Sequence, residues 1–219
     1  MKRRSVARMR TLRRSEERDH QAQAFRGLVL LNEERLPPGG SLSSAPPQGL
    51  EILTYVREGA LSFQDSSGGS GILQAGEFRC TTAGRHCRRD ESNASRTDSA
   101  QVFQMFLRPG QADLEPSEEQ RRFSAAERRG GFRVVAAPDG RCGSLRLHSD
   151  SLVYSALLDL GKHVVHALAP GRGAWVHVVK GAVMFDELLL STGDGAGITD
   201  DRAVSLTARE ETELLLLDV

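Results

Sequence analysis

Three residues of types that bind metals lie within six positions of one another in the first half of the chain: His86, Cys87 and Glu91. Imidazole, thiolate and carboxylate groups are the usual protein donors for divalent transition metals. If this segment is a strand, Cys87, Arg89 and Glu91 share one face and His86 points away. If the chain turns there, the three donors could meet as a metal site. Otherwise His86 is a surface residue and Cys87 is half buried.

Four histidines in the second half of the chain are a further candidate for chemistry: His148, His163, His166 and His177. They are spread over different predicted strands. His163 and His166 are three positions apart, so on one strand they face opposite sides. The pattern does not indicate a shared metal site, and we expect these imidazoles to face solvent or to be satisfied by hydrogen bonds.

Short apolar runs separated by Gly-rich turns must position these residues, and helical periodicity is nearly absent. Evenly spaced short strands are typical of a β-sandwich or β-barrel. The best helical candidate is the charged segment 114–129. A weak internal repeat relates "EGALSF" at 58–63 to "KGAVMF" at 180–185. The sequence therefore predicts an all-β fold of two tandem jelly-roll-like barrels, at residues 25–112 and 132–219, joined by a charged connector at 113–131.

Composition restricts the class of protein further. The 219 residues contain 29 Lys plus Arg and 29 Asp plus Glu, so no net charge attracts nucleic acid or membrane. No apolar run reaches the roughly 18 residues of a membrane span, and Cys80, Cys87 and Cys142 form no CxxC pair. We expect a cytoplasmic protein whose cysteines are small buried hydrophobic residues.

Residues 1–24 form a polar, Arg-rich arm, and the first 14 residues include seven basic side chains and no acidic one. Charge alone could let this arm bind phosphate groups. It has no interleaved aromatic residues and no recognition helix, so we expect a disordered, solvated tail rather than a nucleic-acid site.

The chain resembles the pirin family of the cupin superfamily. In the first half the resemblance rests on "LVLLNEERLPPGG", "LEILTYVREGALSFQDSSGGSGILQAGE", "TTAG" and "QMFLRP". In the second half it rests on "PDGRCGSLRLHSDSLVYSALLDLG", "GRGAWVHVVKGAV" and "LSTGDGAGI". The resemblance implies a bicupin with one metal, usually iron, held in the N-terminal barrel by three His and one Glu. Members of the family have been described as quercetin 2,3-dioxygenases and as iron-dependent transcriptional co-regulators.

The resemblance places the four ligand positions of the family on Ala45, Pro47, Arg89 and Glu91. Ala and Pro offer no side-chain donor atom, and a guanidinium cannot coordinate a metal. Only Glu91 could coordinate, so we expect no cofactor and no catalytic residue. The predicted function is that of a non-catalytic binding or regulatory bicupin, a monomer with an unknown protein partner or a small ligand in its N-terminal barrel. The alternative is a quercetin 2,3-dioxygenase-type enzyme that holds iron or another divalent metal in a remodelled site.

An emptied metal site would leave the Glu91 carboxylate buried in the barrel without a cation, which is costly. Arg89 lies two positions away and would point to the same face of a strand. We therefore expect Arg89 to neutralise Glu91, with Glu51 as a possible competing acid for this guanidinium.

Overall fold

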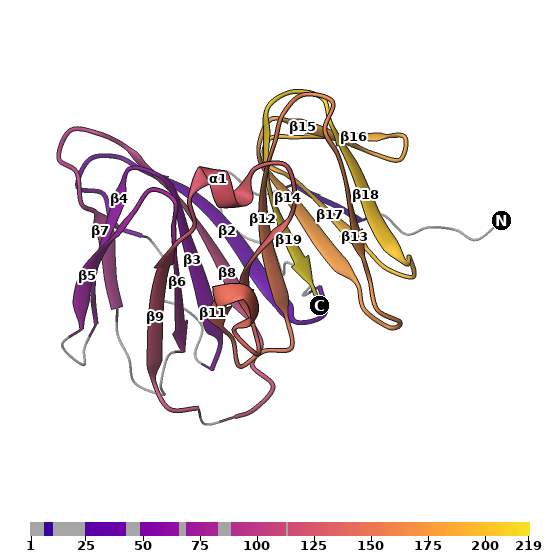
Figure 1. The fold of residues 1–219 in the computed structure, drawn as a ribbon. Coiled ribbons are helices and arrows are strands. Elements are labelled where there is room, and N and C mark those ends of the chain that lie inside the picture. The colour runs from indigo at the N-terminus through magenta and orange to yellow at the C-terminus, as the bar shows by residue number, and fades with distance from the viewer. Residues whose placement is uncertain (1–6, 11–24, 43–48, 66–68, 83–88, 113) are drawn as a thin grey trace.

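The structure is a computed structural model that describes residues 7–10, 25–42, 49–65, 69–82, 89–112 and 114–219. Its N-terminal half consists of two sheets (Figure 1). The larger sheet has the strand order β2-β8-β3-β6-β9 and the smaller has the order β5-β4-β7. The strands are β2 (Leu28–Leu36), β3 (Glu51–Glu58), β4 (Ala60–Asp65), β5 (Ser70–Gln74), β6 (Glu77–Thr82), β7 (Arg89–Asn93), β8 (Ala100–Leu107) and β9 (Ser117–Arg122).

The C-terminal half repeats this two-sheet design, with strand orders β1-β17-β14-β19-β12-β10-β11 and β13-β18-β15-β16. The expected all-β fold of two cupin barrels is confirmed. The elements are β1 (Ala7–Arg10), β10 (Arg133–Ala137), β11 (Leu145–Arg146), β12 (Leu152–Leu158), β13 (His163–Ala167), β14 (Ala174–Lys180), β15 (Ala182–Phe185), β16 (Leu188–Ser191), β17 (Asp194–Ile198), β18 (Ala203–Ala208), β19 (Thr212–Asp218), and a 3-10 turn at Arg141–Gly143.

The internal repeat corresponds to one tight turn in each barrel. Gly59 lies between β3 and β4 with φ +76°, and Gly181 lies between β14 and β15 with φ +88°. A Cβ at Gly59 would lie 2.9 Å from the backbone of Ala100, and one at Gly181 would lie 2.4 Å from the carbonyl oxygen of Glu211. Both turns therefore require glycine, which explains the glycine that the two repeats share.

The charged connector differs from the predicted helix. Residues Ser117–Arg122 form β9, which pairs with β6 at the edge of the N-terminal sheet, and only Ala125–Arg128 are helical, as α1. A capping box between Ser124 and Glu127 starts this short helix. The prediction of a helix over 114–129 was wrong because the free edge of β6 gains a ladder of backbone hydrogen bonds from an extended segment.

The arm also differs from the expectation over four residues. Ala7–Arg10 form β1, paired antiparallel with Asp194–Gly197 of β17. Backbone pairing to a sheet edge does not depend on side-chain charge, so the basic composition did not exclude a strand here. The remainder of the predicted disordered arm, residues 1–6 and 11–24, lies outside the described residues. Within the described part of the chain, no helix is long and apolar enough to cross a membrane.

Buried apolar residues form three clusters. The largest joins residues of both large sheets, such as Tyr55 and Phe103 with Trp175 and Leu215, so these sheets pack face to face. The second fills the C-terminal barrel. The third lies in the N-terminal barrel and is small, consisting of Leu36, Val56, Leu61, Leu73, Ala100 and Val102. Much of the remaining N-terminal interior is polar, and this is where a site can lie.

Candidate functional site

The four family ligand positions are only partly described by the structure. Ala45 and Pro47 lie outside the described residues, as do His86 and Cys87 of the alternative metal site. Arg89 begins β7, where its backbone pairs with Asp65 of β4. The expected contact between the side chains of Arg89 and Glu91 therefore stays a prediction.

Glu91 lies in the middle of β7 and its side chain is buried, with 8% exposed. Its backbone is opposite Phe63 of β4. The side-chain amide of Gln104, on β8, donates a hydrogen bond of 2.9 Å to Oε2 of Glu91. The Oε1 atom accepts a longer contact of 3.5 Å from Nη1 of Arg79, on β6. The carboxylate thus lies between a neutral donor and a cation.

Arg79 is among the most buried side chains of the chain, with 1% exposed. Its Nη2 atom donates to Oε2 of Glu118, on β9, at 2.5 Å. Its guanidinium carbon lies 3.3 Å from the centre of the Phe63 ring, which is a close cation–π contact. Backbone pairing places Arg79 and Gln104 on either side of Thr54 in β3, so the three residues form one row across the sheet.

The row formed by Arg79, Thr54 and Gln104, together with Glu91, Phe63 and Glu118, is the site that we call the Arg79 cluster. It contains one guanidinium and two carboxylates. Within the residues that the structure describes, no group of three or more His, Cys, Asp or Glu side chains could hold a metal ion. The cluster can neutralise and orient charge, but it offers no imidazole to a metal.

Glu51, the possible competitor for Arg89, has partners of its own in the C-terminal half. Glu51 is fully buried on the opposite face of β3, where it accepts hydrogen bonds from the backbone N–H groups of His148 at 2.7 Å and Ser149 at 2.6 Å. Nδ1 of His148 lies 3.0 Å from the same carboxylate. Glu51 therefore attaches a loop of the C-terminal half to the N-terminal sheet.

The other three histidines lie apart. His163 is exposed and contacts the Thr207 hydroxyl at 3.0 Å, and Nε2 of His166 contacts Asp218 at 2.8 Å, as expected for satisfied imidazoles. His177 differs from the expectation because it is 1% exposed, and its Nε2 atom makes no hydrogen bond with the residues that the structure describes. This atom lies 3.7 Å from a carboxylate oxygen of Glu33. Packing between the two large sheets buries the ring despite its polarity.

The two cysteines that the structure describes differ in burial. Cys80 is buried, as expected, whereas Cys142 is exposed in the 3-10 turn, which is a correction to that expectation. Cys142 has a left-handed backbone, with φ +54°, inside this turn.

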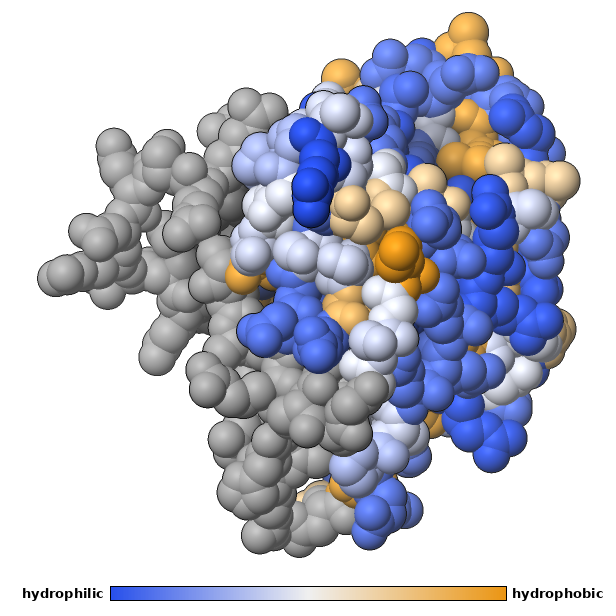
Figure 2. All heavy atoms as spheres, turned by 90° about the vertical axis from the view of Figure 1, so that its left-hand side faces the viewer, coloured by the Kyte–Doolittle hydropathy of each residue, from blue (hydrophilic) through white to orange (hydrophobic). Residues whose placement is uncertain are grey.

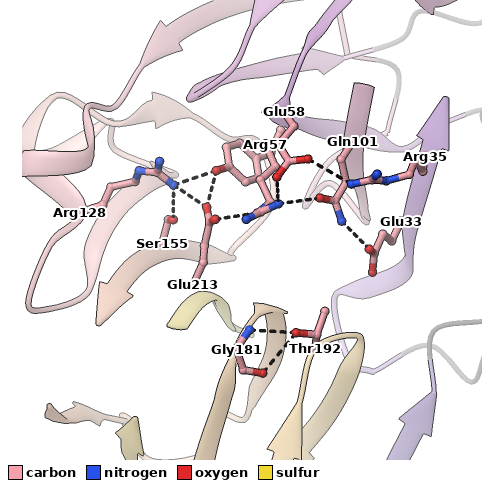
Figure 3. Close-up of polar contacts among 11 residues, drawn as sticks. Glu33, Arg35, Arg57, Glu58, Gln101, Arg128, Ser155, Gly181, Thr192 and Glu213 are labelled. Atoms are coloured by element: carbon pink, nitrogen blue, oxygen red, sulfur yellow. Dashed lines mark hydrogen bonds and ion pairs between the residues drawn. The ribbon is translucent and has the colours of Figure 1, made fainter. Parts of the chain in front are cut away.

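A second polar cluster joins the two barrels (Figure 3). Oε1 of Glu213, on β19, accepts from the Tyr55 hydroxyl and, at 2.9 Å, from Nη1 of Arg128 on α1. Oε2 of Glu213 accepts from Nε of Arg57 at 3.0 Å. Ser155 also contacts Arg128, at 3.2 Å. Burial and the adjacent Glu213 carboxylate raise the pKa of Tyr55, so its hydroxyl stays protonated and donates.

Sequence reasoning identified Glu91 but not Arg79 or Gln104. In β6, Arg79 lies between Phe78 and Cys80, and an alternating pattern of this kind normally predicts that the charged residue faces solvent. The available signal was the position of Arg79 on the same face as Thr81, in a strand that runs into the "TTAG" motif.

Two cupin barrels in one chain, the first with a polar interior, define a bicupin. Residues 8–107 match the family model described as Pirin, and residues 134–219 match the one described as the quercetinase C-terminal cupin domain. The chain belongs to the pirin family.

Similar proteins have names that agree with this family. Quercetin 2,3-dioxygenase of Escherichia coli K12 is 37% identical over 195 residues, which cover 89% of this chain and 83% of the relative. A putative quercetin 2,3-dioxygenase of Zymomonas mobilis is 31% identical over 188 residues, covering 85% and 79%. The bacterial pirin YhhW from E. coli in complex with nickel(II) superposes with a TM-score of 0.86 at 34% identity, covering 98% of this chain and 91% of YhhW.

Within the described ranges, no three His, Cys, Asp or Glu side chains are grouped so that they could hold a metal such as the nickel of the YhhW complex. Of the four positions at which the resemblance places the family ligands, three hold Ala45, Pro47 and Arg89, whose side chains offer a metal no donor atom. The fourth, Glu91, already accepts from Gln104 and Arg79.

Proposed function

We propose that this chain is a pirin-family bicupin that works without a metal, as a non-catalytic binding or regulatory protein. The observation that carries the proposal is the state of Glu91. Its carboxylate is buried and occupied by a side-chain amide and a guanidinium of the same chain. A single carboxylate in this state cannot replace a set of imidazole and carboxylate ligands.

Binding would use the barrel opening or a surface of the N-terminal half. Figure 2 shows one side of this half, and its described atoms are mainly hydrophilic with scattered hydrophobic residues. Large hydrophobic side chains that are exposed, such as Ile72 and Leu189, occur singly on different strands. This pattern favours a polar contact surface or a small ligand over a broad apolar interface.

An activity assay tests the proposal. The protein and the E. coli relative named quercetin 2,3-dioxygenase are purified in the same way and incubated with quercetin, with and without added Fe²⁺ or Ni²⁺. We expect oxygen consumption by the relative and none by this chain under either condition. Metal-dependent oxygenation of quercetin by this chain would contradict the proposal.

One alternative function has a specific observation in its favour. His86 and Cys87 lie in the segment that leads into β7 and Glu91, and several relatives at 30–37% identity are named quercetin 2,3-dioxygenase or putative quercetin 2,3-dioxygenase. A remodelled centre using these donors would make the chain an oxygenase. A variant lacking both donors, His86→Ala combined with Cys87→Ala, would then lose the activity, whereas the proposed function predicts no activity to lose.

A further inference from the structure

In the N-terminal barrel, the Arg79 guanidinium of one sheet lies beside the Glu91 carboxylate of the other sheet. Arg79 is on β6 of the larger sheet, and Glu91 is on β7 of the smaller sheet, which faces it across the barrel (Figure 1). The two side chains meet at 3.5 Å between Nη1 and Oε1, with 1% and 8% exposed. This contact therefore links the two sheets through the polar part of the barrel interior.

Each charged group in the Arg79 cluster can be buried only with an oppositely charged partner beside it. An unpaired guanidinium or carboxylate in a barrel interior would lose its hydration without compensation. Arg79 has Glu118 and Glu91 as acceptors and the Phe63 ring against its planar face. Glu91 has Gln104 as a second donor. Both charges thus have partners, and the residues involved belong to five different strands, β4, β6, β7, β8 and β9. Within the described part of the chain, only Nε of Arg79 in this pair is buried without a hydrogen-bond partner.

We infer that the Arg79 guanidinium takes the place of the metal ion as the cation that organises this barrel. In a metal-bound relative, a bound cation compensates the ligand carboxylate. Here a covalently attached cation does so, and it is present at every metal concentration. Among the residues whose side chains the structure describes, Arg79 is the cation in contact with Glu91, and the contact expected from Arg89 stays a prediction.

This arrangement also disfavours metal binding directly. A divalent cation at the Glu91 carboxylate would lie within a few ångströms of the guanidinium, and like charges at such distances in a poorly hydrated interior repel strongly. Displacing Arg79 would break its contacts with Phe63 and Glu118 as well. The Arg79 cluster and a metal at Glu91 are therefore mutually exclusive.

A double-mutant cycle on the full-length protein tests this inference. Arg79→Met removes the charge and keeps much of the volume, leaving Glu91 buried beside an apolar group. We expect the melting temperature to fall by roughly 6–20 °C, since breaking a buried pair is strongly destabilising in a protein of this size. Adding Glu91→Gln removes the stranded carboxylate and should recover at least half of that loss.

Two controls separate charge from packing. Arg35→Met removes an arginine whose ion pair with Glu58 is exposed, and it should change the melting temperature by less than about 2 °C. Arg79→Lys keeps the charge, so it should cost less than half as much as Arg79→Met. The inference is overturned if Arg79→Lys is as damaging as Arg79→Met, or if Glu91→Gln gives no recovery.

Adding Ni²⁺ or Fe²⁺ alone tests whether the Arg79 cluster excludes a metal from Glu91. We expect no rise in the melting temperature of the wild-type protein with either ion, whereas a saturating rise would overturn the exclusion. The inference rests on the proposed metal-free state, but the two fail separately. Metal found in the purified protein defeats the proposed function, whereas absent coupling between Arg79 and Glu91 defeats only the role of Arg79.

Discussion

The sequence identified Glu91 as a site residue, but it did not predict the side chains that contact Glu91 in the structure. The resemblance identified it as the one remaining ligand-type position, and the structure buries it in the N-terminal barrel. Its partners could not be predicted, because Arg79 and Gln104 are distant in sequence and come from strands whose pairing is set by tertiary structure. Arg79 alternates with Phe and Cys, and this pattern predicts that the arginine faces solvent unless an acidic residue is known to lie opposite it in the barrel.

Asp218 gives a prediction at the same scale. Burial opposes ionisation of its carboxyl, but hydrogen bonds from His166 and Arg172 outweigh this and hold the pKa of Asp218 below its ordinary value of 3.8. The ionised form therefore stabilises the folded protein above about pH 4, and this contribution is lost as the pH falls through the lower pKa of the folded state. The difference in melting temperature between wild type and Asp218→Asn should shrink as the pH falls below about pH 4. A difference that persists unchanged at about pH 2.5 would contradict this.

At the scale of elements, strand content was predictable from periodicity, whereas the connector was not. The segment Ser117–Arg122 has six exposed polar residues and no alternation that marks a strand. Its conformation is decided by the unpaired edge of β6, which local sequence does not contain. The short helix that follows is better specified, since Ser124 and Glu127 form a capping box.

Glu213, on β19, contacts side chains of helix α1 and strand β3. These contacts between elements should contribute to stability. Tyr55→Phe removes the hydroxyl that donates to Glu213 and accepts from Arg128 at 2.9 Å, both in a buried environment. Because two charged groups lose a partner, we expect the free energy of unfolding to fall by about 1–3 kcal/mol. Chemical denaturation measures this loss.

Tyr154→Phe is the matched control, because the half-buried Tyr154 hydroxyl is not part of the Glu213 cluster. It should change the free energy of unfolding by less than about 0.5 kcal/mol. Equal effects of the two substitutions would show that the Glu213 cluster contributes nothing specific.

The whole molecule should unfold as one unit. The largest apolar cluster is shared between the two large sheets, so separating the barrels would expose residues such as Phe103, Trp175 and Leu217 to water. We expect a single calorimetric transition whose van't Hoff and calorimetric enthalpies agree. Two resolved transitions would show that each barrel is stable by itself and that the shared cluster is not essential.

We propose that this bicupin works without a metal, because the Arg79 guanidinium compensates the Glu91 carboxylate. Elemental analysis of the full-length protein, purified without chelators and alongside the E. coli relative that binds nickel, tests this most directly. The account predicts far less than one equivalent of iron, nickel or any other transition metal per chain. About one tightly bound metal ion per chain would contradict it.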